Sequence, residues 1–139
     1  MVTRPRILLT HTPDMRRNYY GPRALAGLQA LGEVALHKGA EPLDTRALIA
    51  AARGCHIIVA DRATPCEAAL FAALPDLVAA ARVAVDIRNI DVEAASAHGV
   101  LVTQASRSWV PAVSELVIGL MIAAARSAGA SPSWRWPSA

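Results

Sequence analysis

Short apolar runs alternate with helical segments five times along this chain, and this alternation restricts its fold more than any other feature. The apolar runs cover residues 6–10, 34–37, 56–60, 77–85 and 100–103, and segments with helical character cover residues 24–31, 45–53, 65–74, 92–97 and 111–126. Short runs that are apolar throughout are typical of parallel strands covered on both faces. Strands that alternate with helices predict an α/β domain, doubly wound around a parallel five-stranded sheet.

Cap and turn residues support the boundaries of these segments. Asp44 and Asp91 stand directly before two helical segments, where a short acidic side chain accepts hydrogen bonds from the first turn. Gly32, Gly54 and Gly99 follow helical segments, and glycine is the residue that most often ends a helix. The carboxyl ends of the strands form the ligand edge of such a sheet. We therefore expect a binding site among residues 11–14, 61–64, 85–89 and 103–108.

Length and composition exclude several classes of protein. A chain of 139 residues suits one domain, and 54% hydrophobic residues are too many for a disordered protein. The net charge is only +3, and the arginines are scattered without interleaved aromatic residues. A nucleic-acid-binding surface would need a basic stripe, so we expect no nucleic-acid partner.

Membrane, secretion and metal signals are also weak. The longest apolar run, residues 116–125, is shorter than the roughly 20 residues that span a bilayer, so we expect no membrane contact. The first six residues are polar and open no secretory signal, which favours the cytoplasm. Cys55 and Cys66 lack the spacing of a metal site or a disulfide framework, and we expect two small semi-buried thiols and no metal.

One segment carries a family resemblance. Residues 82–91 read RVAVDIRNID, and they are followed by VEAA at 92–95, GVLVT at 99–103 and VSE at 113–115. This text resembles the D-isomer-specific 2-hydroxyacid dehydrogenases, whose usual pattern there is R-x-G-x-G-x-D-N-I-D, E-A-A, G-I-x-V-T-N and V-A-E. The resemblance covers about residues 5–126. It implies oxidation of a D-2-hydroxy acid, or reduction of a 2-keto acid, with NAD or NADP.

The resemblance also implies a domain organisation. Residues 1–108 would form a flavodoxin-like substrate-binding domain, and residues 109–126 an apolar helix that crosses toward a dinucleotide-binding domain. In that family the second domain carries the glycine-rich loop and the catalytic Arg, Glu and His, none of which can be placed on this sequence. The chain is thus similar to a substrate-binding half truncated before the NAD-binding domain. Residues 127–139 depart from the pattern, and we expect a disordered or aberrant tail.

The substrate loop carried over from the family is Ala84, Val85 and Asp86, with Val85 also facing the cofactor. Backbone N–H groups of such a loop hold a carboxylate without any charged side chain. Ala84 and Asp86 stand where the family pattern has glycine, and Arg88 stands where it has Asp. Asp86 adds a negative charge where a carboxylate should dock. Either its side chain turns away toward Arg88, or the substrate class differs.

Other polar residues at the ligand edge have competing interpretations. Arg62 can pair with an anionic substrate, but a solvated loop arginine beside Asp61 explains it as well. We expect Arg88 to form a structural ion pair with Asp86 or Asp91. His11 can act as an acid or base, but its lack of a patterned partner favours a loop histidine without a role.

Two functions follow. The first is the substrate-binding portion of an NAD(P)-dependent D-2-hydroxyacid dehydrogenase, inactive as an isolated chain because hydride transfer needs a bound nicotinamide. The alternative is a non-catalytic or regulatory module that binds a small carboxylate. In both, helix 111–126 is apolar almost all round, so we expect it to be buried against a second copy of the chain in a homo-oligomer.

Overall fold

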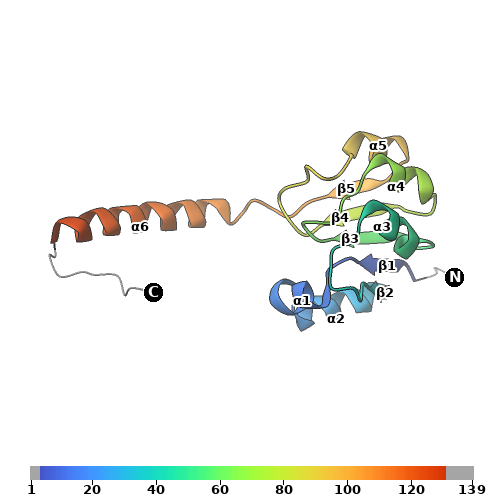
Figure 1. The fold of residues 1–139 in the computed structure, drawn as a ribbon, viewed down its shortest axis with the longest axis horizontal. Coiled ribbons are helices and arrows are strands. Elements are labelled where there is room, and N and C mark those ends of the chain that lie inside the picture. Colours follow the sequence, from blue (N-terminus) through green and yellow to red (C-terminus); the bar gives the residue numbers. More distant parts are fainter. Residues whose placement is uncertain (1–3, 131–139) are drawn as a thin grey trace. The chain divides into compact units, whose positions relative to one another are not determined.

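The fold is built on a five-stranded, all-parallel sheet with the strand order β2-β1-β3-β4-β5 (Figure 1). The computed structural model describes the backbone of residues 4–130 and the side chains of residues 4–127. The strands are β1 (Arg6–Leu9), β2 (Glu33–Leu36), β3 (Ile57–Ala60), β4 (Ala79–Arg82) and β5 (Leu101–Thr103). The predicted α/β class and parallel five-stranded sheet are confirmed. The chain divides into two compact units, with the boundary between Ala105 and Ser106.

Three helices cover one face of the sheet (Figure 1). They are α3 (Thr45–Ala52), α4 (Ala68–Ala73) and α5 (Val92–Ala97). Leu48, Leu70 and Phe71 from these helices are fully buried against Ile58 and Ala80 of the sheet. Burial of one such aliphatic or aromatic side chain stabilises the fold by about 1.5–3 kcal/mol. Because most of the buried apolar side chains lie on this face, it forms the main core.

The opposite face is covered by the chain between β1 and β2. Helix α2 (Pro22–Leu31) packs Leu25 and Leu28 against Ile7 and Leu9 of β1. Before it lie a short helix α1 (Pro13–Met15) and a π-helical turn η1 (Arg16–Tyr20), which the sequence did not predict.

Helix α1 begins where the sequence indicates a break. The proline at position 13 occupies the first turn, where a missing N–H costs nothing, and the Thr12 hydroxyl accepts a hydrogen bond from the Met15 N–H at 3.2 Å. The predicted boundaries are wrong at two further places. The fourth strand ends at Arg82 instead of 85, and α4 begins at Ala68 instead of Pro65. The residue after Pro65, Cys66, instead forms an isolated parallel bridge with Ile90.

The predicted caps are confirmed. Asp44 accepts a hydrogen bond from the Ala47 N–H at 2.7 Å, and Asp91 accepts one from the Ala94 N–H at 2.9 Å. Gly99 closes α5 with φ of +70°, a conformation that side chains disfavour. The short α5 is therefore bounded at both ends by the residues that the sequence predicted.

The second unit consists, in its described part, of helix α6 (Val110–Ala130). The helix runs four residues beyond the predicted end at 126, and residues 131–139 of the predicted tail lie outside the described residues. Leu116, Leu120 and Met121 expose 60–67% of their surface. The window Val110–Ser127 has a mean hydropathy of 1.5 and is, by length and composition, able to cross a membrane. The prediction that this region is too short to cross a bilayer is therefore wrong, because the helix continues on both sides of the apolar run 116–125 through small and polar residues. The absence of membrane contact stays a prediction.

Candidate functional site

The loops after β1, β3 and β4 meet at one edge of the sheet, because parallel strands all end at the same side. Strand β1 continues into Thr10 and His11, β3 into Asp61 and Arg62, and β4 into residues 83–86. In the strand order, β2 lies on one side of β1, and β3, β4 and β5 lie on the other. The direction in which strands are added therefore reverses between β1 and β3. This is the switch point at which such sheets bind ligands.

The predicted substrate loop follows β4 directly. In the described part of the chain, the N–H groups of Ala84, Val85 and Asp86 donate no hydrogen bond, whereas two of the three carbonyl groups are occupied. The Ala84 carbonyl accepts from the Ala105 N–H at 3.0 Å, and the Asp86 carbonyl accepts from Arg82 Nε at 3.1 Å. Three consecutive unpaired N–H groups can bind an anion such as a carboxylate.

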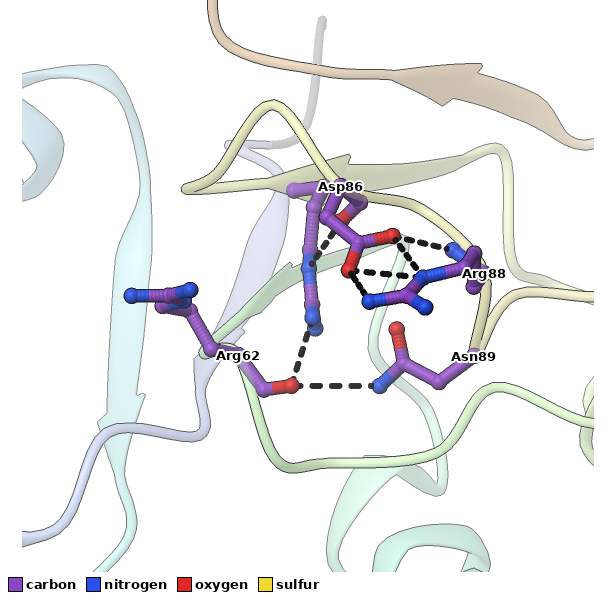
Figure 2. Close-up of polar contacts among 5 residues, drawn as sticks. Arg62, Asp86, Arg88 and Asn89 are labelled. Carbon is purple, nitrogen blue, oxygen red and sulfur yellow. Dashed lines mark hydrogen bonds and ion pairs between the residues drawn. The ribbon is translucent and has the colours of Figure 1, made fainter.

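Asp86 does turn its carboxylate toward Arg88. The Arg88 Nε donates to both carboxylate oxygens at 3.0 Å, Nη2 donates to Oδ2 at 2.7 Å, and the Arg88 N–H also donates to Oδ1 at 3.0 Å (Figure 2). These hydrogen bonds lower the pKa of Asp86 to about 2. The predicted Arg88 ion pair is confirmed with Asp86 as its partner, so the extra negative charge on the loop is compensated locally.

Arg62 contributes its backbone to this region. Its carbonyl accepts from Arg82 Nη2 at 2.6 Å and from the Asn89 side-chain amide at 3.4 Å. Its exposed side chain points away from the Asp86–Arg88 pair (Figure 2). The structure thus brings together Ala84, Val85, Asp86 and the Arg62 backbone, but not the Arg62 guanidinium.

Asp61, directly after β3, is a buried carboxylate at the ligand edge of the sheet, for which no role was predicted. It accepts hydrogen bonds from the hydroxyls of Thr10 at 2.6 Å and Thr64 at 2.5 Å, and from the N–H groups of Ala63 and Thr64. Burial raises the pKa of Asp61, but these four hydrogen bonds outweigh it and hold the pKa below its usual value. The Asp-x-x-Thr spacing at 61–64 was the available signal.

His11 is also buried, which the sequence analysis did not expect of a loop residue. Only 4% of it is exposed, its ring lies 5.2 Å from the Tyr20 ring, and its Nδ1 has no hydrogen-bond partner in the described part of the protein. Burial lowers the pKa of His11; the Asp61 charge opposes this shift, and Arg16 and Arg82 add to it. The neutral ring therefore packs as part of the core beneath η1.

The two cysteines are free thiols, as predicted, and both are fully buried instead of semi-buried. Burial raises the pKa of Cys66 to about 11, so this thiol stays protonated and unreactive at neutral pH. Among the described residues, no group of three His, Cys, Asp or Glu side chains is arranged to hold a metal ion.

The described residues do not fit a dinucleotide by themselves. A pyrophosphate needs a glycine-rich turn that leads from a strand into a helix N-terminus. After β1 that turn is occupied by the buried His11 ring and by the Thr12 hydroxyl, which caps the three-residue α1. After β3 it is occupied by Asp61, a buried anion. Neither turn leaves space or charge for a pyrophosphate.

Known proteins include relatives that match most of this chain. A D-3-phosphoglycerate dehydrogenase from Mycobacterium leprae is 34% identical over 103 residues, which are 74% of this chain and 20% of that protein. A glyoxylate reductase from Korarchaeum cryptofilum is 30% identical over 104 residues, which are 75% of this chain and 31% of that protein. The chain therefore spans less than a third of the length of these relatives.

A solved structure extends the comparison. The crystal structure of the NADPH-dependent glyoxylate/hydroxypyruvate reductase from Sinorhizobium meliloti, in complex with NADP and malonate, matches with a TM-score of 0.61 and 26% identity. The match covers 86% of this chain and 34% of that one. Residues 7–131 match the family model described as D-isomer specific 2-hydroxyacid dehydrogenase, catalytic domain. On that match, which takes in β1 to β5 and α6, the chain belongs to the D-isomer specific 2-hydroxyacid dehydrogenase family of oxidoreductases.

Proposed function

We propose that this chain is the substrate-binding portion of an NAD(P)-dependent D-2-hydroxyacid dehydrogenase. Its ligand is a small 2-keto or 2-hydroxy acid, whose carboxylate is held by the backbone N–H groups of Ala84, Val85 and Asp86. The observation that carries the proposal is a set of three N–H groups at the carboxyl edge of the sheet that have no hydrogen-bond partner among the described residues. Two similar proteins, a glyoxylate reductase and a glyoxylate/hydroxypyruvate reductase, are named for substrates of the same size and charge, which supports this proposal.

The chemistry of the loop is binding and orientation. A carboxylate that accepts several backbone hydrogen bonds is fixed in direction, and the neighbouring 2-keto carbon is fixed with it. The pairing of Asp86 with Arg88 reduces the repulsion that Asp86 would exert on that carboxylate. Val85, in the middle of the loop, is the residue that would lie against a nicotinamide supplied by a dinucleotide-binding domain.

The remaining organisation is proposed with it. Residues 1–108 bind the substrate, and residues 109–126 form the interface helix through which two copies of the chain associate. Arg62 acts as an auxiliary anion-binding side chain once it turns toward the loop. The protein works in the cytoplasm, and the chain by itself does not transfer hydride, because its described turns do not fit a dinucleotide.

A binding experiment tests the substrate loop. The ¹⁵N-labelled chain is titrated with glyoxylate and with hydroxypyruvate, and amide shifts are followed by NMR. We expect saturable shifts at Ala84, Val85 and Asp86, and none with glycolaldehyde, which lacks the carboxylate. Saturable shifts that avoid these three residues, or no saturable shifts, would contradict the proposal.

A second candidate is a non-catalytic module that binds a small carboxylate, favoured by the misfit between the described turns and a pyrophosphate. Both candidates predict binding, and both predict that this chain alone consumes no NADH in the presence of glyoxylate. They differ when a dinucleotide-binding domain is supplied in trans from the M. leprae relative: turnover that depends on residues 84–86 supports the dehydrogenase. If the chain binds glyoxylate but shows no turnover at any concentration of the added domain, the result supports the non-catalytic module.

A further inference from the structure

We propose that Arg82 is the positioning residue that shapes the carboxylate-binding loop, through its guanidinium contacts with the loops after β3 and β4. This inference rests on the function proposed above for residues 84–86. Arg82 touches neither substrate nor cofactor in this scheme. It acts by holding the backbone that does.

The contacts of Arg82 are unusual for a buried cation. It is the last residue of β4, and only 5% of it is exposed. Nε donates to the Asp86 carbonyl at 3.1 Å, Nη2 donates to the Arg62 carbonyl at 2.6 Å, and Nη1 donates to the Asp61 carbonyl. One guanidinium therefore connects three carbonyl groups from two separate loops.

No carboxylate among the described residues lies within ion-pair distance of Arg82, although the charges of Asp61 and Asp86 act on it. Burying an arginine is costly, and buried arginines are normally paired with an acid. Within the described residues Arg82 forms no salt bridge, and its donors are directed at backbone carbonyl groups of the ligand edge. A buried charge whose three recorded hydrogen bonds all go to two site loops is explained by the geometry of those loops more directly than by stability.

The geometry links these contacts to the unpaired N–H groups. In a trans peptide, the carbonyl of one residue and the N–H of the next point in opposite directions. Because the Ala84 carbonyl is held by the Ala105 N–H, the Val85 N–H points away from Ala105. Arg82 holds the Asp86 carbonyl at the other end of the loop. The loop backbone is therefore held at Ala84 by Ala105 and at Asp86 by Arg82, and the Val85 N–H between these two points is kept directed away from Ala105.

The shape of the guanidinium matters more than its charge. A guanidinium is planar and has donors in a fixed fork, so it can reach carbonyl groups on different sides at once. A lysine ammonium has the same charge but is a single point on a flexible stem. Arg82→Lys therefore keeps the positive charge behind the loop and removes the three-way connection.

The experiment compares Arg82→Lys with Arg23→Lys, a matched change at an exposed arginine of α2. Both are first checked for folding by the dispersed amide signals of β1 and β3. In the ligand-free proteins, ¹⁵N relaxation measures the order of residues 84–86, and calorimetry then measures glyoxylate binding. We expect a disordered loop and at least a tenfold weaker glyoxylate affinity in Arg82→Lys, and wild-type behaviour in Arg23→Lys.

The outcomes separate this inference from the proposed function. If wild-type protein binds no glyoxylate, the proposed function fails, and the order of residues 84–86 in Arg82→Lys still decides whether Arg82 positions the loop. If wild-type and Arg82→Lys bind glyoxylate equally and have equally ordered loops, the positioning role is overturned and the proposed function stands.

A measurement on the unmodified protein covers the case in which Arg82→Lys does not fold. The Arg82 Nε–H signal should shift on addition of glyoxylate with the same dissociation constant as the amides of residues 84–86. The Arg23 Nε–H signal should not move. An Arg82 signal that stays in place while the loop amides titrate would overturn the positioning role.

Discussion

The Arg88 guanidinium pairs with both carboxylate oxygens of Asp86, through Nε at 3.0 Å and Nη2 at 2.7 Å. The pair is exposed, with 91% of the Arg88 side chain accessible, and exposed pairs contribute little to stability. Its effect is on the charge of the loop, where an isolated carboxylate would repel an anionic ligand.

Removal of the arginine should therefore change titration and binding more than folding. In Arg88→Ala, the pKa of Asp86 should rise from about 2 toward its ordinary value of 3.8, because the side-chain hydrogen bonds and the charge of Arg88 are lost, while the backbone N–H of residue 88 still donates to Oδ1. Glyoxylate affinity should fall. Carboxyl-carbon NMR titration measures the pKa, and an unchanged Asp86 titration in Arg88→Ala would contradict this account. Arg17→Ala, which breaks another exposed pair, with Asp14, is the control.

Asp61 should be a stability residue. Asp61→Ala leaves the buried hydroxyls of Thr10 and Thr64 and two N–H groups without their acceptor. With four hydrogen bonds lost at about 1 kcal/mol each, we expect a loss of about 4 kcal/mol. Urea unfolding measures it. Thr64→Val removes one of these bonds and should lose less; equal stability of Asp61→Ala and wild type would refute the role.

His11 should make stability depend on pH near neutrality. Its folded pKa lies below the ordinary 6.5, so between these two values the unfolded chain binds more protons than the folded one. The free energy of unfolding should thus rise with pH through this window and level off above 6.5. Urea midpoints between about pH 5 and pH 8 show the slope. The slope should flatten in His11→Asn, and a slope that survives this change belongs to another group.

Gly32 should tolerate no side chain. A Cβ atom there would overlap the Pro5 carbonyl oxygen and lie 2.9 Å from the Ile7 Cδ1, and the same carbonyl accepts the Glu33 N–H that opens the β1–β2 pairing. Gly32→Ala should cost about 1–3 kcal/mol in unfolding free energy through overpacking. Gly27→Ala is the matched control: that site is open and helical, so alanine should stabilise by about 0.5–1 kcal/mol.

Helix α6 should mediate self-association. Leu120 is 60% exposed on an apolar helix, and Leu120→Glu should reduce the apparent mass of the chain in light scattering at high micromolar concentration. The spectrum of β1–β5 should not change, because α6 belongs to a separate compact unit. A strictly monomeric wild type, or one that floats with phospholipid vesicles, would contradict association through this helix.

The sequence predicted the architecture because its signals were local. Asp44, Asp91 and Gly99 end their helices through contacts within a few residues, and the short apolar runs need no distant information to predict parallel strands. The chain between β1 and α2 was missed because Pro13 and Asp14 are ambiguous. The same two residues suit a turn or the first turn of a helix, and only the Thr12 cap decides between them.

Contacts of the candidate site were predicted only where both partners lie close together in the sequence. The Asp86–Arg88 pair spans two residues and was anticipated. The roles of Arg82 and Asp61 were not. The Asp61 carbonyl lies 21 residues from Arg82, and Thr10 lies 51 residues from Asp61, on strands that become neighbours only in the folded sheet. For Asp61 a local signal, the Asp-x-x-Thr spacing, was also overlooked. The burial of His11 was missed because it depends on Tyr20, which a turn folds back over the strand end.

The strand order also has a consequence for biosynthesis. The three strands at one end of the sheet, β2, β1 and β3, all lie within the first 60 residues, and β4 and then β5 are each added to the same growing edge. Each of β3, β4 and β5 is therefore synthesised after the strand with which it first pairs. A ribosome-bound chain can pair β1 with β2 and β3 while the rest is still being made. Strand β5 pairs last, and the residue that holds the Ala84 carbonyl of the ligand loop, Ala105, follows shortly after it.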